Sequence, residues 1–163
     1  MKHVLVSFIL LLIWSNCAVG QTVINNAKST ETKNEAEITG ALSSFIEAWN
    51  KHDAKAFSLV FAEDADFTNV RGMSAHGRSD VEKFHAPLFA TAFKDTNQKI
   101  TNIKIRFIKP DVAAVDAWWE MTGVKNPAGQ DIPLRKGLLN FVMTKANDKW
   151  LITVMHNMDL PVS

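Results

Sequence analysis

Residues 61–93 read FAEDADFTNVRGMSAHGRSDVEKFHAPLFATAF, and this stretch joins a strand pattern to a helix pattern. In its first part Ala65, Phe67 and Asn69 share one parity of an alternating segment, which is typical of a β-strand. In its last part apolar residues recur at helical intervals, and the stripe includes His85. Both patterns place polar side chains inward. An unpaired buried polar group costs about 1–3 kcal/mol, so these residues belong to a structural network or line a pocket.

Two helices are predicted before this stretch. Thr32 and Glu35 have the spacing of a capping box, and apolar residues recur at helical intervals over 38–49, so the first helix is expected to begin at Thr32. Asp53 is a favourable N-cap for a second, shorter helix. These helices precede the first strand in the chain.

A third helix is predicted after the first strand. Gly72 and Gly77 bracket a tight turn, and Ser79 to Glu82 repeat the capping-box spacing that begins a helix. Pro87 then falls in the helix interior, where it removes a backbone hydrogen bond, so a kink is expected beside His85.

From Lys99 onward every predicted element is a strand. The strand patterns cover residues 103–107, 112–123, 134–145 and 150–158. Helices first and sequential strands afterwards predict an α+β fold: a cone-shaped barrel of a strongly curved antiparallel sheet, packed against three N-terminal helices. We expect an apolar pocket between the helices and the concave face of the sheet.

Residues 1–20 have the pattern of a secretory signal peptide. A basic start is followed by an apolar run shorter than the roughly 20 residues of a spanning helix, and small residues precede Gln21. We expect cleavage near Gly20, a secreted or periplasmic protein, and no stable membrane insertion. Cys17 offers an alternative lipoprotein site, but Trp14-Ser15-Asn16 is a poor approach to an acylated cysteine. The expected layout is signal peptide 1–20, flexible linker 21–32 and one domain, 33–160.

Charge and motifs exclude several classes of function. Without Lys2 the formal net charge falls from +1 to zero, and the basic residues are scattered, so nucleic-acid binding is not expected. Cleavage near Gly20 would remove the single cysteine. His76, His85 and His156 fall on different elements without the spacing of a zinc motif, so no metal is predicted. Glycine elbows and nicotinamide or flavin fingerprints are absent as well, so no cofactor is predicted.

Strand parity predicts which residues line the pocket. In the strand predicted at 112–123, the residues on the same face as Trp119 are apolar. In the last predicted strand, His156 lies on the same face as Trp150. If these faces are concave, Trp119 and His156 point into the pocket. The opposite faces are also partly apolar and predict a homodimer interface on the outer sheet face, formed by Trp118, Leu151 and Met155.

Several motifs resemble a known family. DADFTNVRG, HGR before FHAPLFATAF, WEMTG and KWLITVMHNM are similar to the SnoaL-like branch of the nuclear transport factor 2-like superfamily, close to its SgcJ/EcaC group. The resemblance covers about residues 35–159. It implies a cone-shaped α+β barrel, usually dimeric, with a pocket under the helices. The family's distant ketosteroid isomerase relatives use a tyrosine, and this chain has none.

The candidate site residues keep alternative interpretations. His156 and His85 are candidate acid/base groups, or histidines satisfied by neighbouring groups. Asn69 either orients a histidine or contacts the ligand, and Arg135 either sits at the pocket rim or pairs with Glu120. Further expected ligand-binding residues are Trp119, Trp49 and Phe67.

Two classes of function remain open. The first is a pocket for a small hydrophobic organic ligand with isomerase, cyclase or hydratase activity that needs no cofactor. The second is a non-catalytic module that sequesters a ligand or mediates dimerisation. The inward histidines favour catalysis, and the lack of tyrosine and of an inward carboxylate favours binding.

Overall fold

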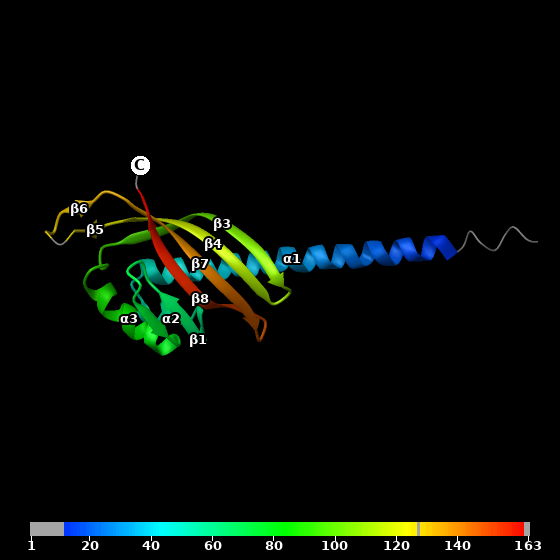
Figure 1. The fold of residues 1–163 in the computed structure, drawn as a ribbon, viewed down its shortest axis with the longest axis horizontal. Coiled ribbons are helices and arrows are strands. Elements are labelled where there is room, and N and C mark those ends of the chain that lie inside the picture. The colour runs from blue at the N-terminus through cyan, green and yellow to red at the C-terminus, as the bar shows by residue number, and fades with distance from the viewer. Residues whose placement is uncertain (1–11, 127, 162–163) are drawn as a thin grey trace, which may run out of the picture. The chain divides into compact units, whose positions relative to one another are not determined.

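The computed structural model describes residues 12–126 and 128–161, with side chains from residue 28 onward. The chain divides into two units, Met1–Ala36 and Glu37–Ser163, and the second contains the sheet. The elements in chain order are α1 (Leu12–Asn50), α2 (Ala54–Ser58), β1 (Phe61–Thr68), β2 (Ser74–His76), α3 (Arg78–Ala90), β3 (Asn97–Lys109), β4 (Val112–Thr122), β5 (Val124–Lys125), β6 (Asp131–Ile132), β7 (Arg135–Ala146) and β8 (Lys149–Leu160) (Figure 1).

In the first unit the described residues are helical and belong to α1. The prediction that the first helix begins at Thr32 is therefore wrong, and residues 21–32, expected as a linker, are helical. The Thr32 hydroxyl donates to the carbonyl oxygen of Lys28 at 3.0 Å, a bond that threonine makes inside helices. Residues 1–11 of the expected signal peptide lie outside the described residues. No helix that the structure describes is long and apolar enough to span a membrane.

The second unit is built on a six-stranded sheet in the order β2-β1-β8-β7-β4-β3. All neighbours pair antiparallel except β1 and β8, which are parallel. A separate hairpin joins β5 to β6. The predicted α+β fold with a curved, mainly antiparallel sheet is thus confirmed. The sheet ends at β2 and β3, so its hydrogen bonding does not close it into a full barrel.

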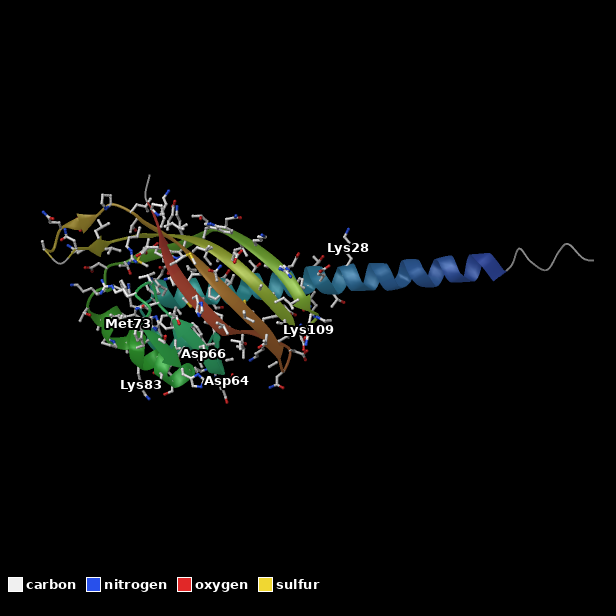
Figure 2. The ribbon with its side chains drawn as sticks, in the orientation of Figure 1. Lys28, Asp64, Asp66, Met73, Lys83 and Lys109 are labelled. Atoms are coloured by element: carbon white, nitrogen blue, oxygen red, sulfur yellow. The ribbon has the colours of Figure 1, made fainter. Side chains whose placement is uncertain are left out.

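One face of the sheet carries the core. On β4 the buried residues alternate from Ala113 to Met121, as the parity predicts. On β1 Ala65 and Phe67 are buried, whereas Asp64 and Asp66 are exposed (Figure 2). The last part of α1 together with α2 and α3 lies over the buried face (Figure 1). Each fully buried large apolar side chain contributes about 1.5–3 kcal/mol, so this contact is the main source of stability.

The N-termini of α2 and α3 differ in how their free backbone amides are capped. Asp53 caps α2 as predicted, because its Oδ1 accepts from the Ala56 amide at 2.9 Å. The capping box predicted at Ser79 is wrong: α3 begins at Arg78, and Gly77 occupies the N-cap position without a side-chain bond. Gly77 has φ 81°, which a residue with a side chain rarely adopts. The helix continues through Pro87.

The last strand contains an irregularity that decides which side chains face inward. Val142 pairs with Val154, but the next residue, Met143, pairs with Ile152, so Thr153 is an extra residue in β8. Such a bulge shifts the alternation by one position. Trp150 and Ile152 are buried before it, and Met155 is buried after it. The parity predicted for the strand therefore holds only up to Ile152.

Candidate functional site

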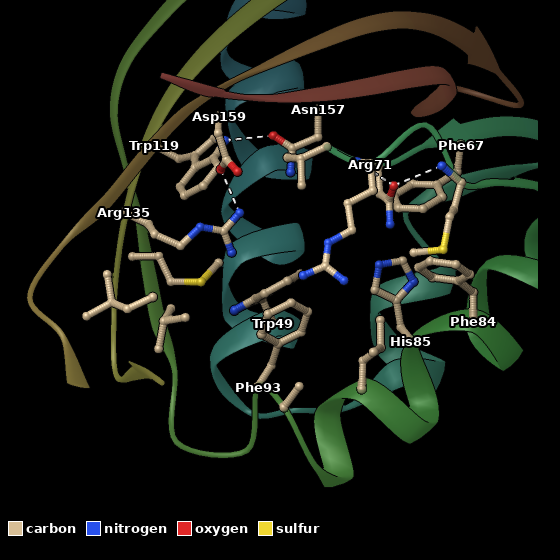
Figure 3. Close-up of a pocket in the computed structure, with 18 of the residues that line it drawn as sticks. Trp49, Phe67, Arg71, Phe84, His85, Phe93, Trp119, Arg135, Asn157 and Asp159 are labelled. Atoms are coloured by element: carbon tan, nitrogen blue, oxygen red, sulfur yellow. Dashed lines mark hydrogen bonds and ion pairs between the residues drawn. The ribbon is translucent and has the colours of Figure 1, made fainter. Parts of the chain in front are cut away.

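A cavity of about 430 Å³ lies between the buried face of the sheet and the helices α1 and α3 (Figure 3). The β1–β2 turn and the β5–β6 hairpin contribute to its walls. Most lining side chains are apolar or aromatic. The lining residues are Trp49, Phe67, Asn69, Val70, Arg71, Met73, Phe84, His85, Leu88, Ala92, Phe93, Trp119, Met121, Val124, Lys125, Asn126, Ile132, Arg135, Met155, Asn157 and Asp159.

His85 on α3 is the titratable group set deepest in the aromatic wall. The residue is 3 % exposed, and its ring centroid lies 4.4 Å from that of Phe57 and 4.9 Å from that of Phe67. Its Nδ1 lies 2.8 Å from the carbonyl oxygen of Val81. Because a carbonyl only accepts, Nδ1 carries the proton, and the neutral ring keeps its lone pair on Nε2. Among the described residues the only hydrogen bond of the ring is the one at Nδ1, and Nε2 is not one of the fully buried atoms without a partner, so it is open to the cavity into which the ring points (Figure 3).

Burial determines the charge of this histidine. Removal of the ring from water lowers the pKa of His85 from 6.5 to about 4, and the hydrogen bond to Val81 opposes the shift only in part. His85 is therefore neutral near pH 7. It offers the cavity a hydrogen-bond or proton acceptor, and not a positive charge.

A polar wall faces His85 across the cavity, and Trp119 is at its centre. The indole Nε1 donates to Oδ1 of Asn157 at 2.9 Å. Arg135 lies over the indole, with Cζ 5.6 Å from the ring centroid, and its Nη2 is 2.6 Å from Oδ1 of Asp159. Trp119 can lie flat against β7 because its cross-strand partner is Gly137. This wall is held by contacts within the protein and needs no ligand to order it.

The β1–β2 turn supplies the third part of the site. Asn69 Oδ1 accepts from the backbone amides of Arg71 and Met73 at 2.9 and 3.0 Å, and the Asn69 amide donates to the carbonyl oxygen of Met73. Asn69 thus orders the turn, a role different from the two predicted from the sequence, which were to orient a histidine or to contact the ligand. Among the described residues it bonds neither histidine. The turn directs Arg71 into the cavity (Figure 3).

The prediction that His156 points inward is wrong. His156 is exposed and is not among the residues that line the cavity, because the bulge at Thr153 reverses the parity of β8. The same reversal moves Met155, predicted on the outer face, into the core, and Asn157 into the cavity wall.

The remaining predicted residues do line the cavity. Trp119, Trp49, Phe67, His85, Asn69 and Arg135 all contribute to its wall. Arg135 pairs with Asp159, whereas Glu120 pairs with Lys99 and Lys136, at 3.0 and 3.4 Å.

Sequence patterns did not single out Arg71, Asn157 and Asp159. Asn157 belongs to the HN pair that carried the family resemblance, but strict alternation assigned it to the outer face. Arg71 lies in a turn, where periodicity carries no information. Across residues 12–126 and 128–161, no group of three histidine, cysteine or acidic side chains is arranged to hold a metal ion.

The comparison with known families decides the identity of the domain. The model of a family described as SnoaL-like domain matches residues 42–151. The chain belongs to the SnoaL-like domain family. The SnoaL-like domain includes the last part of α1, both short helices and the strands as far as β8, and hence most of the cavity wall. It is part of the nuclear transport factor 2-like superfamily.

Solved structures share the fold of this SnoaL-like domain. An uncharacterised protein with a cystatin-like fold from Caulobacter vibrioides is 24% identical, with a TM-score of 0.72 over 79% of this chain and 91% of that one. A putative scytalone dehydratase from Novosphingobium aromaticivorans is 16% identical, with a TM-score of 0.72 over 82% and 89%. The hexachlorocyclohexane dehydrochlorinase LinA-type3 from Novosphingobium barchaimii is 13% identical, with a TM-score of 0.75 over 83% and 92%. At these identities the likeness concerns the fold alone. No curated protein matches this chain in sequence.

Proposed function

We propose that this SnoaL-like domain binds a small, mainly apolar organic molecule in the cavity and that Nε2 of His85 accepts a hydrogen bond from it. The observation that carries the proposal is the state of His85: Nδ1 is bonded to Val81, and the lone pair of Nε2 is open to an aromatic cavity and makes no hydrogen bond among the described residues. A ligand with a hydroxyl, an N–H or an acidic C–H can donate to that acceptor, and the bond is strong in an apolar cavity because the local dielectric is low.

The size and lining of the cavity support this proposal. Its volume of about 430 Å³ falls within the range of about 300–1,000 Å³ common for small-molecule sites. The cavity wall carries the rings of Trp49, Phe67 and Phe84, which contact His85, and that of Phe93, which contacts Trp49. These rings favour an aromatic or alicyclic body.

A catalytic role of His85 is the second candidate, in a reaction of the isomerase, cyclase or hydratase type. The specific support is the unprotonated Nε2, since proton transfer needs an acceptor within reach of the ligand. Two structures with this fold bear the names of a dehydratase and a dehydrochlorinase. The low pKa of His85 favours a substrate whose C–H or O–H is already activated, because a weak base removes only an acidic proton.

Two experiments separate these functions. Native mass spectrometry of the gently purified protein should detect a bound organic molecule, and His85→Phe should lose it while keeping the fold by circular dichroism. Incubation of that molecule with the protein in D₂O then tests proton transfer. Deuterium incorporated with wild type and not with His85→Phe supports catalysis, and binding without exchange supports the non-catalytic module. Retention of the molecule at wild-type affinity by His85→Phe would contradict the assigned role of His85.

We also propose that the outer face of the sheet pairs with a second copy of the chain. Trp118, Leu138 and Met158 are in register across β4, β7 and β8 and form an apolar row on that face. In the adjacent row Asp116 aligns through Asn140 with His156, so a two-fold arrangement can bring the carboxylate of one copy beside the imidazole of the other. Sedimentation equilibrium should give a dimer for wild type and a monomer for Leu138→Lys. A wild-type monomer at micromolar concentration would contradict the proposal.

Membership of the SgcJ/EcaC group and export of the protein are two further proposals. The support for the group is the set of motifs DFTNV, HGR, WEMTG and HNM. The support for a secreted or periplasmic location is the leader pattern of residues 1–20. N-terminal sequencing of the protein from its native host should begin at Gln21, and an intact N-terminus in the cytosol would contradict export.

A further inference from the structure

The charges that line the cavity do not balance. Lys125 lies 3.5 Å from Asp131, and Arg135 lies 2.6 Å from Asp159, so each of these cations has an acidic partner. The guanidinium of Arg71 has no ion pair or hydrogen bond within residues 28–126 and 128–161. Because His85 is neutral near pH 7, it adds no charge. The cavity therefore presents one uncompensated positive charge.

The position of this charge is determined by the turn that carries it. Asn69 Oδ1 binds the backbone amides on both sides of Gly72, whose φ of 74° completes the turn. The backbone of Arg71 is thus held in place without its side chain taking part. Figure 3 shows the side chain of Arg71 extending into the cavity, into which His85 also points.

Arg71 and His85 bind different chemical groups of a ligand. Arg71 offers only donors and a charge, and its planar guanidinium matches the two oxygens of a carboxylate. Nε2 of His85 offers only an acceptor. An anionic oxygen is attracted to Arg71 and repelled by the lone pair of His85, so the orientation of a ligand that carries both an anion and a hydrogen donor is determined.

We propose that the ligand of this cavity is an organic carboxylate: an apolar body with a carboxylate that pairs with Arg71 and an O–H, N–H or acidic C–H group that faces His85. This inference rests on the proposed ligand-binding function and adds the chemical class to it. A single guanidinium balances the one negative charge of a carboxylate, whereas a phosphate dianion would leave a second negative charge uncompensated in a mainly apolar cavity.

Paired probes test the charge separately from the apolar cavity. 1-Naphthaleneacetic acid and 1-naphthaleneacetamide have the same ring and similar shape and differ in charge at pH 7. Their affinities are measured by isothermal titration calorimetry, because naphthalene absorbs and emits in the same range as tryptophan. The variants are Arg71→Gln, Arg71→Lys and, as a control of equal charge change, Arg106→Gln, whose exposed side chain on β3 is not among the lining residues.

Wild type and Arg106→Gln should bind the acid about fivefold more tightly than the amide, a preference that declines with added NaCl, since an exposed ion pair contributes up to about 1 kcal/mol. Arg71→Gln should bind both probes equally, with the affinity for the amide unchanged, and Arg71→Lys should keep part of the preference. Equal binding of acid and amide by wild type would overturn the carboxylate inference and leave the ligand-binding function in place. If neither probe binds, the apolar binding site itself is refuted, and the inference with it.

Discussion

Gly137 on β7 lies directly under the indole of Trp119, its cross-strand partner on β4. A methyl group at position 137 would overlap the six-membered ring of Trp119 and the carbonyl oxygen of Met158. The orientation of this large side chain in the cavity wall therefore depends on the absence of a side chain opposite it. This pairing also leaves Trp119 free to donate to Asn157.

Substitution Gly137→Ala should displace the indole and destabilise the protein by about 1–3 kcal/mol, the usual cost of overpacking a core. Urea denaturation measures the loss, and the fluorescence of the folded protein should shift as Trp119 moves. The matched control is Gly40→Ala on α1, where an added methyl group meets nothing within 4 Å. Equal stability of Gly137→Ala and wild type would show that the wall repacks freely.

The stability of the protein should depend on pH through His85. Its pKa is lowered from 6.5 to about 4 by burial, so below pH 6.5 the unfolded chain binds a proton that the folded protein excludes. The free energy of unfolding should therefore fall by about 3 kcal/mol between pH 7 and pH 4 from this group alone. Urea denaturation of His85→Phe, which keeps an aromatic ring in place, should show a smaller decrease by that amount. Parallel pH profiles for the two proteins would contradict the assigned protonation state.

The bulge in β8 predicts opposite effects for two adjacent residues. His156→Ala should leave 1-naphthaleneacetamide affinity unchanged, because the side chain is exposed and away from the cavity. Asn157→Leu removes the acceptor of the Trp119 N–H and should cost about 1–3 kcal/mol of stability, since it leaves a largely buried donor without a partner. Binding titration and urea denaturation of both variants check this contrast. If only His156→Ala lost probe binding, His156 would have to face the cavity, and the bulge in β8 would be contradicted.

A stabilising substitution is expected in the turn between β7 and β8. Asn147 and Asp148 both have positive φ, 49° and 60°, as a two-residue hairpin turn requires. Glycine is favoured at the second position, so Asp148→Gly should raise the free energy of unfolding by about 0.5–1 kcal/mol. Thermal denaturation measures the gain. Asp111→Gly, at an exposed residue between β3 and β4, should not stabilise.

The fold follows from periodicity to a large extent. Alternation from Ala113 to Met121 and the helical stripe of α3 are long patterns, and burial agrees with both. The capping-box spacing predicts a helix start at Thr32, although α1 begins further upstream, because a threonine whose hydroxyl bonds Lys28 within a helix has the same sequence signature as a cap. A local spacing of this kind does not show whether the residues before it are also helical.

The site was only partly predictable, for a different reason. His85, Trp119 and Trp49 were identified because long apolar stripes direct them inward. Asn157 was assigned to the wrong face because an extra residue in one strand depends on pairing with its neighbour, which a single strand's pattern does not contain. The direction of the Arg71 side chain is set by a turn, and turns have no periodic pattern from which it could be predicted.

The irregular pairing at Thr153 also has a consequence for how this pocket can change over time. Everything in β8 beyond that point is displaced by one position, so Met155 and Asn157 face the ligand space while His156 and Met158 face the outside. A shift of the bulge from Thr153 to the far end of the strand would exchange these two sets at once without altering any of their identities, whereas loss of Thr153 would make the pairing regular and leave both sets facing as they do. A lineage carrying this scaffold can thereby acquire a different chemical lining by relocating one bulge rather than through several coordinated substitutions.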